Sequence, residues 1–235
     1  MAESKQKTTQ NVTQAAKPSG LLKSSSIVSA MTLISRVLGL ARDVFVASYF
    51  GARADAFFVA FKIPNFFRRL FAEGAFSVAF VPVLSEYKVQ EKDIRSLVRS
   101  VSGTLLAILG PFTILAVAAA PILTWIFAPG FASDANKFAL TSDLLRITFP
   151  YLLLISLTAF YGSVLNTYGQ FAIPAVTPVL LNVCLIVATL YFTPWFDEPL
   201  MALAWGVLLA GVTQLAFQLP FVMKLGLLAL PKPAF

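Results

Sequence analysis

The sequence predicts an all-α fold, a polytopic membrane bundle of six transmembrane helices. The 235 residues are 58% hydrophobic and 12% charged, with a mean hydropathy of +0.80, whereas soluble domains carry about 25% charged residues. No residue in 151–196 is charged, and that stretch can hold two helices of about 20 residues each. Segments of alternating hydrophobicity, which mark a membrane β-barrel, are absent.

Two parts are expected along the chain. Residues 1–23 are polar, and the run is too long and polar for the start of a signal peptide. We therefore interpret it as a disordered cytoplasmic tail. Residues 24–235 form the predicted six-helix transmembrane lobe, with spans at about 27–50, 55–87, 101–127, 144–165, 173–191 and 201–223.

Proline and glycine positions predict irregularities within these spans. The second span, 55–87, is too long for one straight crossing, and Pro64 and Gly74 can bend or break it. The alternative is one crossing followed by a re-entrant or interfacial piece. Pro150 predicts a kink in the fourth span, and the charges in 86–99 predict a loop.

The positions of lysine and arginine predict the orientation in the membrane. These residues concentrate in 1–23, in 86–99 and at Lys224, and segments rich in them stay in the cytoplasm. Both ends of this chain are therefore expected to be cytoplasmic in a multi-pass protein. The net charge of +7 comes from lysines and arginines that lie between and beside the spans, where they set the orientation. We therefore expect membrane lipids and no nucleic acid among the partners.

Residue types absent from the chain exclude much catalytic chemistry. The sequence has no histidine and one cysteine, Cys184, which lies in an apolar run. A single cysteine cannot build a disulfide or a cysteine-based metal site within the chain. Signatures of P-loop proteins, serine hydrolases and zinc peptidases are also absent. We predict no enzyme, no cofactor and no metal.

Charged residues recur within apolar sequence over 35–73, where a centred Arg, Lys or Asp costs about 2.5 to 3.5 kcal/mol on an insertion scale. One interpretation is a polar cavity that takes an anion, and arginine suits phosphate because its planar fork binds two oxygens. The alternative is a set of interfacial anchors whose long side chains snorkel to the headgroups. The charged residues are Arg36, Arg42, Asp43, Arg53, Asp55, Lys62, Arg68, Arg69 and Glu73.

Helical geometry groups some of these side chains. On a helix at 100° per residue, one narrow stripe contains Asp55, Lys62, Asn65, Arg69 and Glu73, with Arg68 one position off it. Arg69 and Glu73 are spaced to pair. Arg36 and Arg42 lie about 240° apart, so they share a face only if the helix deforms, which Gly39 between them permits.

Other polar residues have simpler interpretations. Arg146 is expected to be an interface anchor or a partner of Asp143, and Asn182 is expected to form a helix–helix hydrogen bond.

Long sequence motifs resemble a known family. The runs SRVLGLARD and ADAFFVAFKIPNFFRRLFAEGAFSVAFVPVLSEYK resemble the start of MurJ/MviN-type lipid II flippases, as do KFALTSDLLRITFPYLLLISL and NTYGQFAIPAVTPVLLN. The resemblance covers 22–235. It implies one lobe of an exporter of the multidrug/oligosaccharidyl-lipid/polysaccharide (MOP) superfamily, in which two six-helix lobes face each other. It also implies transport of lipid II, the undecaprenyl-diphosphate-linked disaccharide-peptide, across the bacterial inner membrane for peptidoglycan and cell wall biosynthesis.

The resemblance also implies site residues. Arg36, Arg42 and Arg68 match positions thought to hold the pyrophosphate and headgroup, and Asp55 matches another functional position. Spacing favours Arg69 where the resemblance favours Arg68, and both are kept. The predicted substrate-binding set is Arg36, Arg42, Asp55, Lys62, Asn65, Arg68, Arg69 and Glu73.

The resemblance is to an amino-terminal lobe, so a missing carboxy-terminal lobe is an expected partner, and the chain is expected to be a fragment or a truncated product. Two alternatives remain: an exporter of another lipid-linked glycan or of a drug, and a non-transporting membrane assembly module if the truncation is natural.

Overall fold

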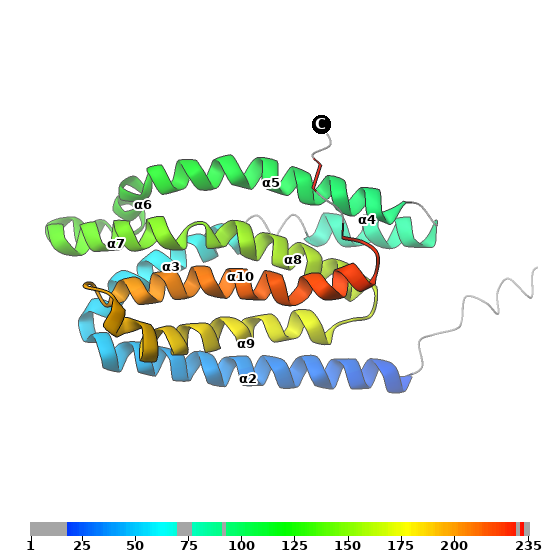
Figure 1. Ribbon diagram of the computed structural model, residues 1–235, viewed down its shortest axis with the longest axis horizontal. Coiled ribbons are helices and arrows are strands. Elements are labelled where there is room, and N and C mark those ends of the chain that lie inside the picture. Colours follow the sequence, from blue (N-terminus) through cyan, green and yellow to red (C-terminus); the bar gives the residue numbers. More distant parts are fainter. Residues whose placement is uncertain (1–17, 70–76, 91–92, 229–230, 233–235) are drawn as a thin grey trace, which may run out of the picture.

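The computed structural model describes residues 18–69, 77–90, 93–228 and 231–232 (Figure 1). Every regular element in these ranges is helical, which confirms the all-α prediction. The α-helices are α2 (Pro18–Phe50), α3 (Ala54–Arg68), α4 (Ser77–Val89), α5 (Ile94–Ala118), α6 (Ala120–Phe127), α7 (Ala135–Thr148), α8 (Tyr151–Thr167), α9 (Ala172–Val187) and α10 (Leu200–Lys224).

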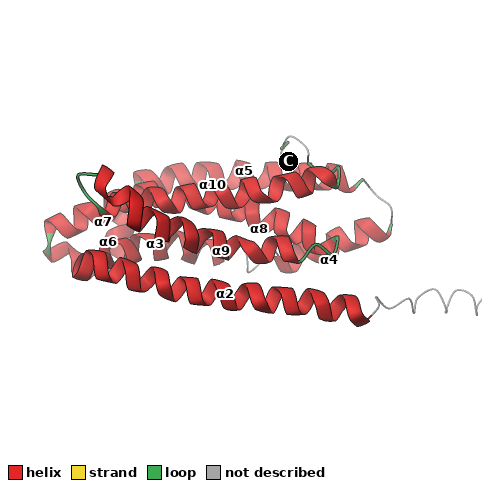
Figure 2. Ribbon diagram, turned by 60° about the horizontal axis from the view of Figure 1, so that its bottom comes forward, coloured by secondary structure: helices red, strands yellow, loops and turns green. Residues whose placement is uncertain are grey.

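The helices lie side by side along the long axis of the molecule (Figure 1). Helix α2 forms one edge and packs mainly along α9, whereas α3 packs mainly along α7 and α10 lies against α8 and α9. In the rotated view α2 again runs along the edge of the bundle (Figure 2). Helices α2 and α3 therefore follow each other in the chain but pack mainly against different helices.

Five helical stretches are long and apolar enough to cross a membrane: Ser25–Arg68, Ile94–Ala118, Ala135–Thr167, Ala172–Trp195 and Leu200–Lys224. The first, at 44 residues, would extend about 66 Å as one helix, twice a hydrocarbon core of about 30 Å. The chain reverses within it at the 3₁₀ turn Gly51–Arg53, where Gly51 adopts a left-handed φ of 53°. The six-span count stays a prediction, because Gly74 and the rest of 70–76 lie outside the described residues.

Several predicted boundaries differ from the structure; the fourth span, expected from about residue 144, begins with α7 at Ala135. Helix α2 begins at Pro18, within the expected tail. The expected loop over 86–99 is mostly helical, because α4 continues to Val89 and α5 begins at Ile94. Asp93 caps α5 by accepting a hydrogen bond from the Ser96 amide at 3.0 Å. The charged residues of 86–99 therefore lie mostly on the last turn of α4 and the first turns of α5, beyond the apolar parts of these helices.

The prolines behave differently from one another. The predicted kink at Pro150 is a break, since α7 ends at Thr148 and α8 starts at Tyr151. Pro64 lies inside α3, which continues to Arg68 without interruption.

Small residues set how closely α10 approaches its neighbours. A Cβ atom on Gly206 would lie 2.7 Å from the Ala188 Cβ, and one on Gly211 would lie 2.8 Å from the Tyr151 Cδ2. Small residues allow this close backbone approach between membrane helices. The contact at Gly211 fixes the buried Tyr151 at the start of α8, and this side chain lines a polar pocket described below.

Candidate functional site

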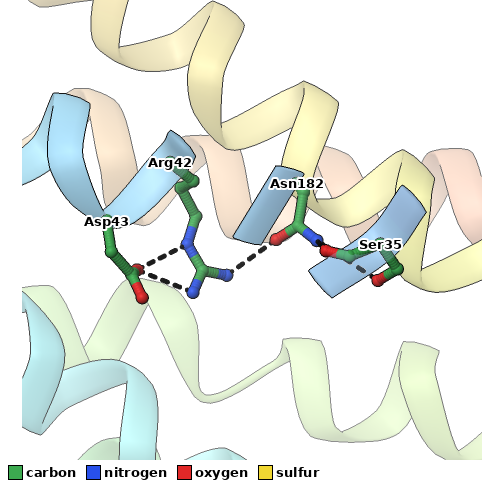
Figure 3. A network of polar contacts seen from close by, with 4 residues as sticks. All are labelled: Ser35, Arg42, Asp43 and Asn182. Carbon is green, nitrogen blue, oxygen red and sulfur yellow. Dashed lines mark hydrogen bonds and ion pairs between the residues drawn. The ribbon is translucent and has the colours of Figure 1, made fainter. Parts of the chain in front are cut away.

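A polar network joins the middle of α2 to α9 (Figure 3). The Asp43 Oδ1 accepts hydrogen bonds from the Arg42 Nε at 2.9 Å and Nη2 at 2.7 Å. The Arg42 Nη1 donates to the Asn182 Oδ1 at 2.9 Å. The Asn182 Nδ2 in turn donates to the Ser35 carbonyl oxygen at 2.9 Å. Three of the guanidinium N–H groups are thus engaged, out of about five that arginine carries.

The face of α2 that meets Asn182 is set by helical spacing. Ser35, Gly39 and Arg42 follow one another at intervals of four and three residues and share a face. The Arg42 side chain is 16% exposed, whereas Arg36 is exposed and points off this face. Helix α2 is continuous from Pro18 to Phe50, so the deformation at Gly39 that would align Arg36 with Arg42 is not present.

Arg36 and Arg68 lie at similar depths along their helices. Arg36 is 15 residues before Gly51, and Arg68 is 15 residues after Arg53, so each lies about 22 Å from the turn at about 1.5 Å per residue. Both arginines are therefore at about the same distance from the turn, and that distance is less than the thickness of a hydrocarbon core of about 30 Å.

Arg68 lines a pocket of about 290 Å³ between α3, α8, α9 and α10. Its polar lining comes from all four helices: Asn65, Arg68, Tyr151, Thr158, Ser163, Asn166, Thr177, Gln214 and Gln218. The Tyr151 hydroxyl donates to the Gln214 Oε1 at 3.3 Å, and the Gln214 Nε2 donates to the Thr177 carbonyl at 2.6 Å. We call this the Arg68 pocket.

Arg69 faces a different cavity from Arg68. This cavity, of about 580 Å³, is lined by Lys62, Asn65, Phe66 and Arg69, and the side chains of Lys62 and Arg69 are exposed. Asn65 lines both cavities, and its Nδ2 donates to the Phe61 carbonyl at 2.9 Å. The predicted stripe therefore keeps Lys62, Asn65 and Arg69 together, while the adjacent Arg68 lines the other pocket.

Asp55 does not join these arginines. It forms an ion pair with Lys137 at the start of α7. Asp55 is 13 residues before Arg68 in α3, so the two residues are about 20 Å apart along the helix. Nearby, the Arg53 Nη2 lies 2.6 Å from the Glu198 Oε2. Glu73 lies outside the described residues.

Several lining residues were missed by sequence reasoning. Gln214 and Gln218 are spaced four apart in an otherwise apolar helix, which was a usable signal. Tyr151 carries no such signal. The interpretation of Asn182 as a helix–helix hydrogen bond is confirmed, although its contact with Arg42 was not foreseen. Arg146 pairs with Asp143 at 2.5 Å, as one of its two interpretations predicted.

In the described part of the chain, no group of three or more aspartate, glutamate or cysteine side chains is placed to hold a metal ion.

Together these features define a class: a multi-span helical membrane protein in which two arginines, Arg42 and Arg68, lie among polar groups of the helices. A family model described as "Lipid II flippase MurJ" matches residues 46–235, which cover most of the chain. The chain belongs to the MurJ lipid II flippase family, as the sequence motifs predicted. Members of this family lie in the bacterial inner membrane.

Individual relatives agree with the family match. A probable lipid II flippase MurJ of Vibrio cholerae is 51% identical over 223 residues, covering 90% of this chain and 42% of that protein. The lipid II flippase MurJ of Burkholderia cenocepacia is 44% identical over 214 residues, covering 89% and 42%. A solved structure titled "Lipid II flippase MurJ, inward closed conformation" aligns with a TM-score of 0.67 at 30% identity, covering 88% of this chain and 43% of that one. The chain thus spans about two fifths of the length of these relatives, at their amino-terminal part.

Proposed function

We propose that this chain is the amino-terminal lobe of a flippase that moves lipid II from the inner to the outer leaflet of the bacterial inner membrane. The observation that supports this most is Arg68, which lies half-buried in a polar pocket inside an apolar bundle. A guanidinium held there attracts the diphosphate of the substrate, while the polyprenyl chain stays in lipid.

Arg42 is suited to the same anion. Its contacts with Asp43 and Asn182 hold the planar group in a fixed orientation, and the remaining N–H groups are available to phosphate oxygens. Asp43 balances the charge while no substrate is bound, so the site avoids an uncompensated cation in a medium of low dielectric constant. Arg36, Lys62 and Arg69 are exposed and enlarge the cationic surface around the headgroup.

A second lobe completes the transport site. The lobe described here supplies one wall, and rocking against an opposite lobe would expose the site to each side in turn. An inside-negative potential favours outward movement of the anion by about 2.3 kcal/mol per charge per 100 mV.

Both ends of this chain are placed in the cytoplasm in this proposal. The start of α2 and the end of α10 lie at the same end of the bundle, together with the junction between α4 and α5 (Figure 1). The positively charged segments thus gather at one end, as the distribution of lysine and arginine in cytoplasmic loops requires.

Replacing Arg42 or Arg68 tests the proposal. Arg42→Ala or Arg68→Ala in the full-length protein is expected to abolish growth of a flippase-depleted strain, because the diphosphate loses its charged donors. The matched control is Arg53→Ala, whose side chain is exposed and pairs with Glu198 at the far end of the bundle. Normal growth of either the Arg42 or the Arg68 variant at normal expression would exclude the role.

Direct binding separates this function from its rivals. The purified full-length protein should bind lipid II in preference to a cationic drug, which an exporter of drugs would bind instead. A non-transporting assembly module would bind neither.

A further inference from the structure

An ion pair is exposed on α7 at the depth of the membrane core. The span formed by α7 and α8 runs from Ala135 to Thr167 and has its middle at residue 151. Arg146 lies five residues and Asp143 eight residues before this middle, which are about 8 and 12 Å along a helix. Half of a hydrocarbon core is about 15 Å, so both residues lie within its depth. Their side chains are 45% and 48% exposed.

The pair lies on the side of α7 that is turned away from α3. The Thr148 hydroxyl donates to the Ala60 carbonyl of α3, and Lys137 pairs with Asp55 of the same helix. Arg146 follows Lys137 by nine residues, which places it about half a turn around the helix from the contact with α3. An opposite lobe that faces α2 and α3 therefore does not cover this pair.

The exposed surfaces beside the pair are apolar. Helix α7 lies between α6 and α10 (Figure 1), and the large exposed side chains of these two helices are Ile122, Trp125, Ile126, Phe127, Trp205, Leu209, Val212 and Met223. Lipid tails are as apolar as leucine and suit such surfaces. A charge turned towards lipid costs free energy, so the composition of α7 indicates contact with another protein.

The spacing along α7 is that of a seam between paired helices. Ala139, Asp143, Arg146 and Pro150 are wholly or partly exposed and follow one another at intervals of four, three and four residues. These are the intervals of the a and d positions through which paired helices meet. The small side chain of Ala139 permits close approach of a second helix. We call these four residues the α7 seam.

The hydrogen-bonding capacity left on the ion pair defines the complementary group. The Arg146 Nη1 donates to the Asp143 Oδ1, and neither side chain makes another hydrogen bond within the described part of the chain. The guanidinium keeps further donors, and the Asp143 Oδ2 remains an acceptor. A side-chain amide carries both an acceptor and a donor, so asparagine or glutamine satisfies the pair without adding a charge.

A second copy of this chain fits the α7 seam poorly. Two copies in one membrane have the same orientation, so their α7 helices would pair in parallel. In a parallel pair each a position faces the other a position, and each d position faces the other d position. Asp143 would then face Asp143 and Arg146 would face Arg146, and like charges repel.

We propose that the α7 seam docks a transmembrane helix of a different membrane protein, and that this helix carries asparagine or glutamine at the depth of the Asp143–Arg146 pair. The inference goes beyond the proposed function, and its test uses no lipid II, so the two fail separately.

Two synthetic transmembrane peptides provide the test. Both consist of leucine and alanine, and they differ only in carrying asparagine or leucine at the matching depth. Energy transfer measures the association of each labelled peptide with the labelled full-length protein in vesicles of phosphatidylethanolamine and phosphatidylglycerol. The protein is wild type, the double variant Asp143→Leu/Arg146→Leu, or the matched control Leu209→Ala, which changes a side chain on α10 that is also 45% exposed.

Wild type and Leu209→Ala should bind the asparagine peptide about tenfold more tightly than the leucine peptide, which corresponds to about 1.4 kcal/mol. The double variant should bind both peptides alike. Its melting temperature should equal or exceed that of wild type, because an exposed ion pair contributes little to stability. A lower melting temperature would show that the pair supports the fold instead, and would overturn the inference.

Two further outcomes would overturn it. Equal binding of the two peptides by wild type would mean that the ion pair only reaches the lipid headgroups by snorkelling. Energy transfer between two labelled copies of the full-length protein, abolished in the double variant, would assign the α7 seam to a second copy.

Discussion

At the scale of single residues, Asn182 links a charged side chain to the packing of two helices. It accepts from Arg42 and donates to the Ser35 carbonyl, so one amide satisfies groups on two turns of α2. Buried polar groups that are fully paired fix one arrangement, because any other leaves them without partners.

Asn182→Ala should therefore reduce transport and stability together. The Arg42 guanidinium loses an acceptor, and loss of a hydrogen bond to a charged group destabilises by about 1.5 to 3 kcal/mol. Thermal unfolding and a lipid II transport assay measure the two effects. Asn136→Ala, at an exposed position, is the control, and the prediction is wrong if the two variants behave alike.

The candidate site was only partly accessible from the sequence at this scale. Helical spacing in α3 could group Lys62, Asn65 and Arg69, because the pattern is local. It could not assign Arg68 to a pocket between helices, because that depends on how α8, α9 and α10 pack near it. The contact between Arg42 and Asn182 joins residues 140 positions apart, and nothing in one sequence specifies such a pair.

At the scale of helices, composition and length predicted most elements. Long apolar segments must form helices in lipid because each backbone polar group needs a partner within the segment. Helix ends were less accessible. Charge indicated a loop at 86–99, yet α4 and α5 extend into it because a helix satisfies its backbone equally well in water. Pro150 and Pro64 look alike in sequence, but only Pro150 separates two helices.

The glycines of α10 give a prediction at this scale. Gly211→Ala should destabilise by about 1 to 3 kcal/mol through overpacking, because the new Cβ would meet Tyr151 at 2.8 Å and Leu154 at 3.0 Å. Gly110→Ala in α5 is the control, since a Cβ there meets nothing within 4 Å. Alanine favours a helix interior over glycine by about 1 kcal/mol, so the control should be neutral or stabilising. Equal melting temperatures for the two variants would contradict the packing argument.

At the scale of the whole molecule, the two ends of the bundle differ in charge. One end gathers the segments rich in lysine and arginine, and the other holds the pairs Asp55–Lys137 and Arg53–Glu198. These partly exposed pairs contribute only up to about 1 kcal/mol each. Their main effect is to join the turn after α2 to the starts of α7 and α10, so they fix geometry more than stability.

Cysteine labelling checks the orientation of the bundle. In a Cys184→Ser background, Ser133→Cys should react with a membrane-impermeant maleimide added to intact spheroplasts, because the proposed topology places the 3₁₀ helix Pro129–Ser133, before α7, outside the cytoplasm. Ser96→Cys, near the start of α5, should react only after the membrane is opened. Both serines are exposed, so access to the thiol is comparable, and the reverse pattern would invert the proposed topology.

The carboxylate of Asp43 has a consequence for release of cargo. It already occupies two N–H groups of Arg42, so in the proposed function the diphosphate meets a guanidinium whose charge is partly balanced, and it binds through the remaining N–H groups. In that proposal the same carboxylate stays beside the bound diphosphate and repels it. A transporter must release its substrate in every cycle. A carboxylate with the same sign of charge as the substrate, next to the arginine, lowers the affinity and so favours release.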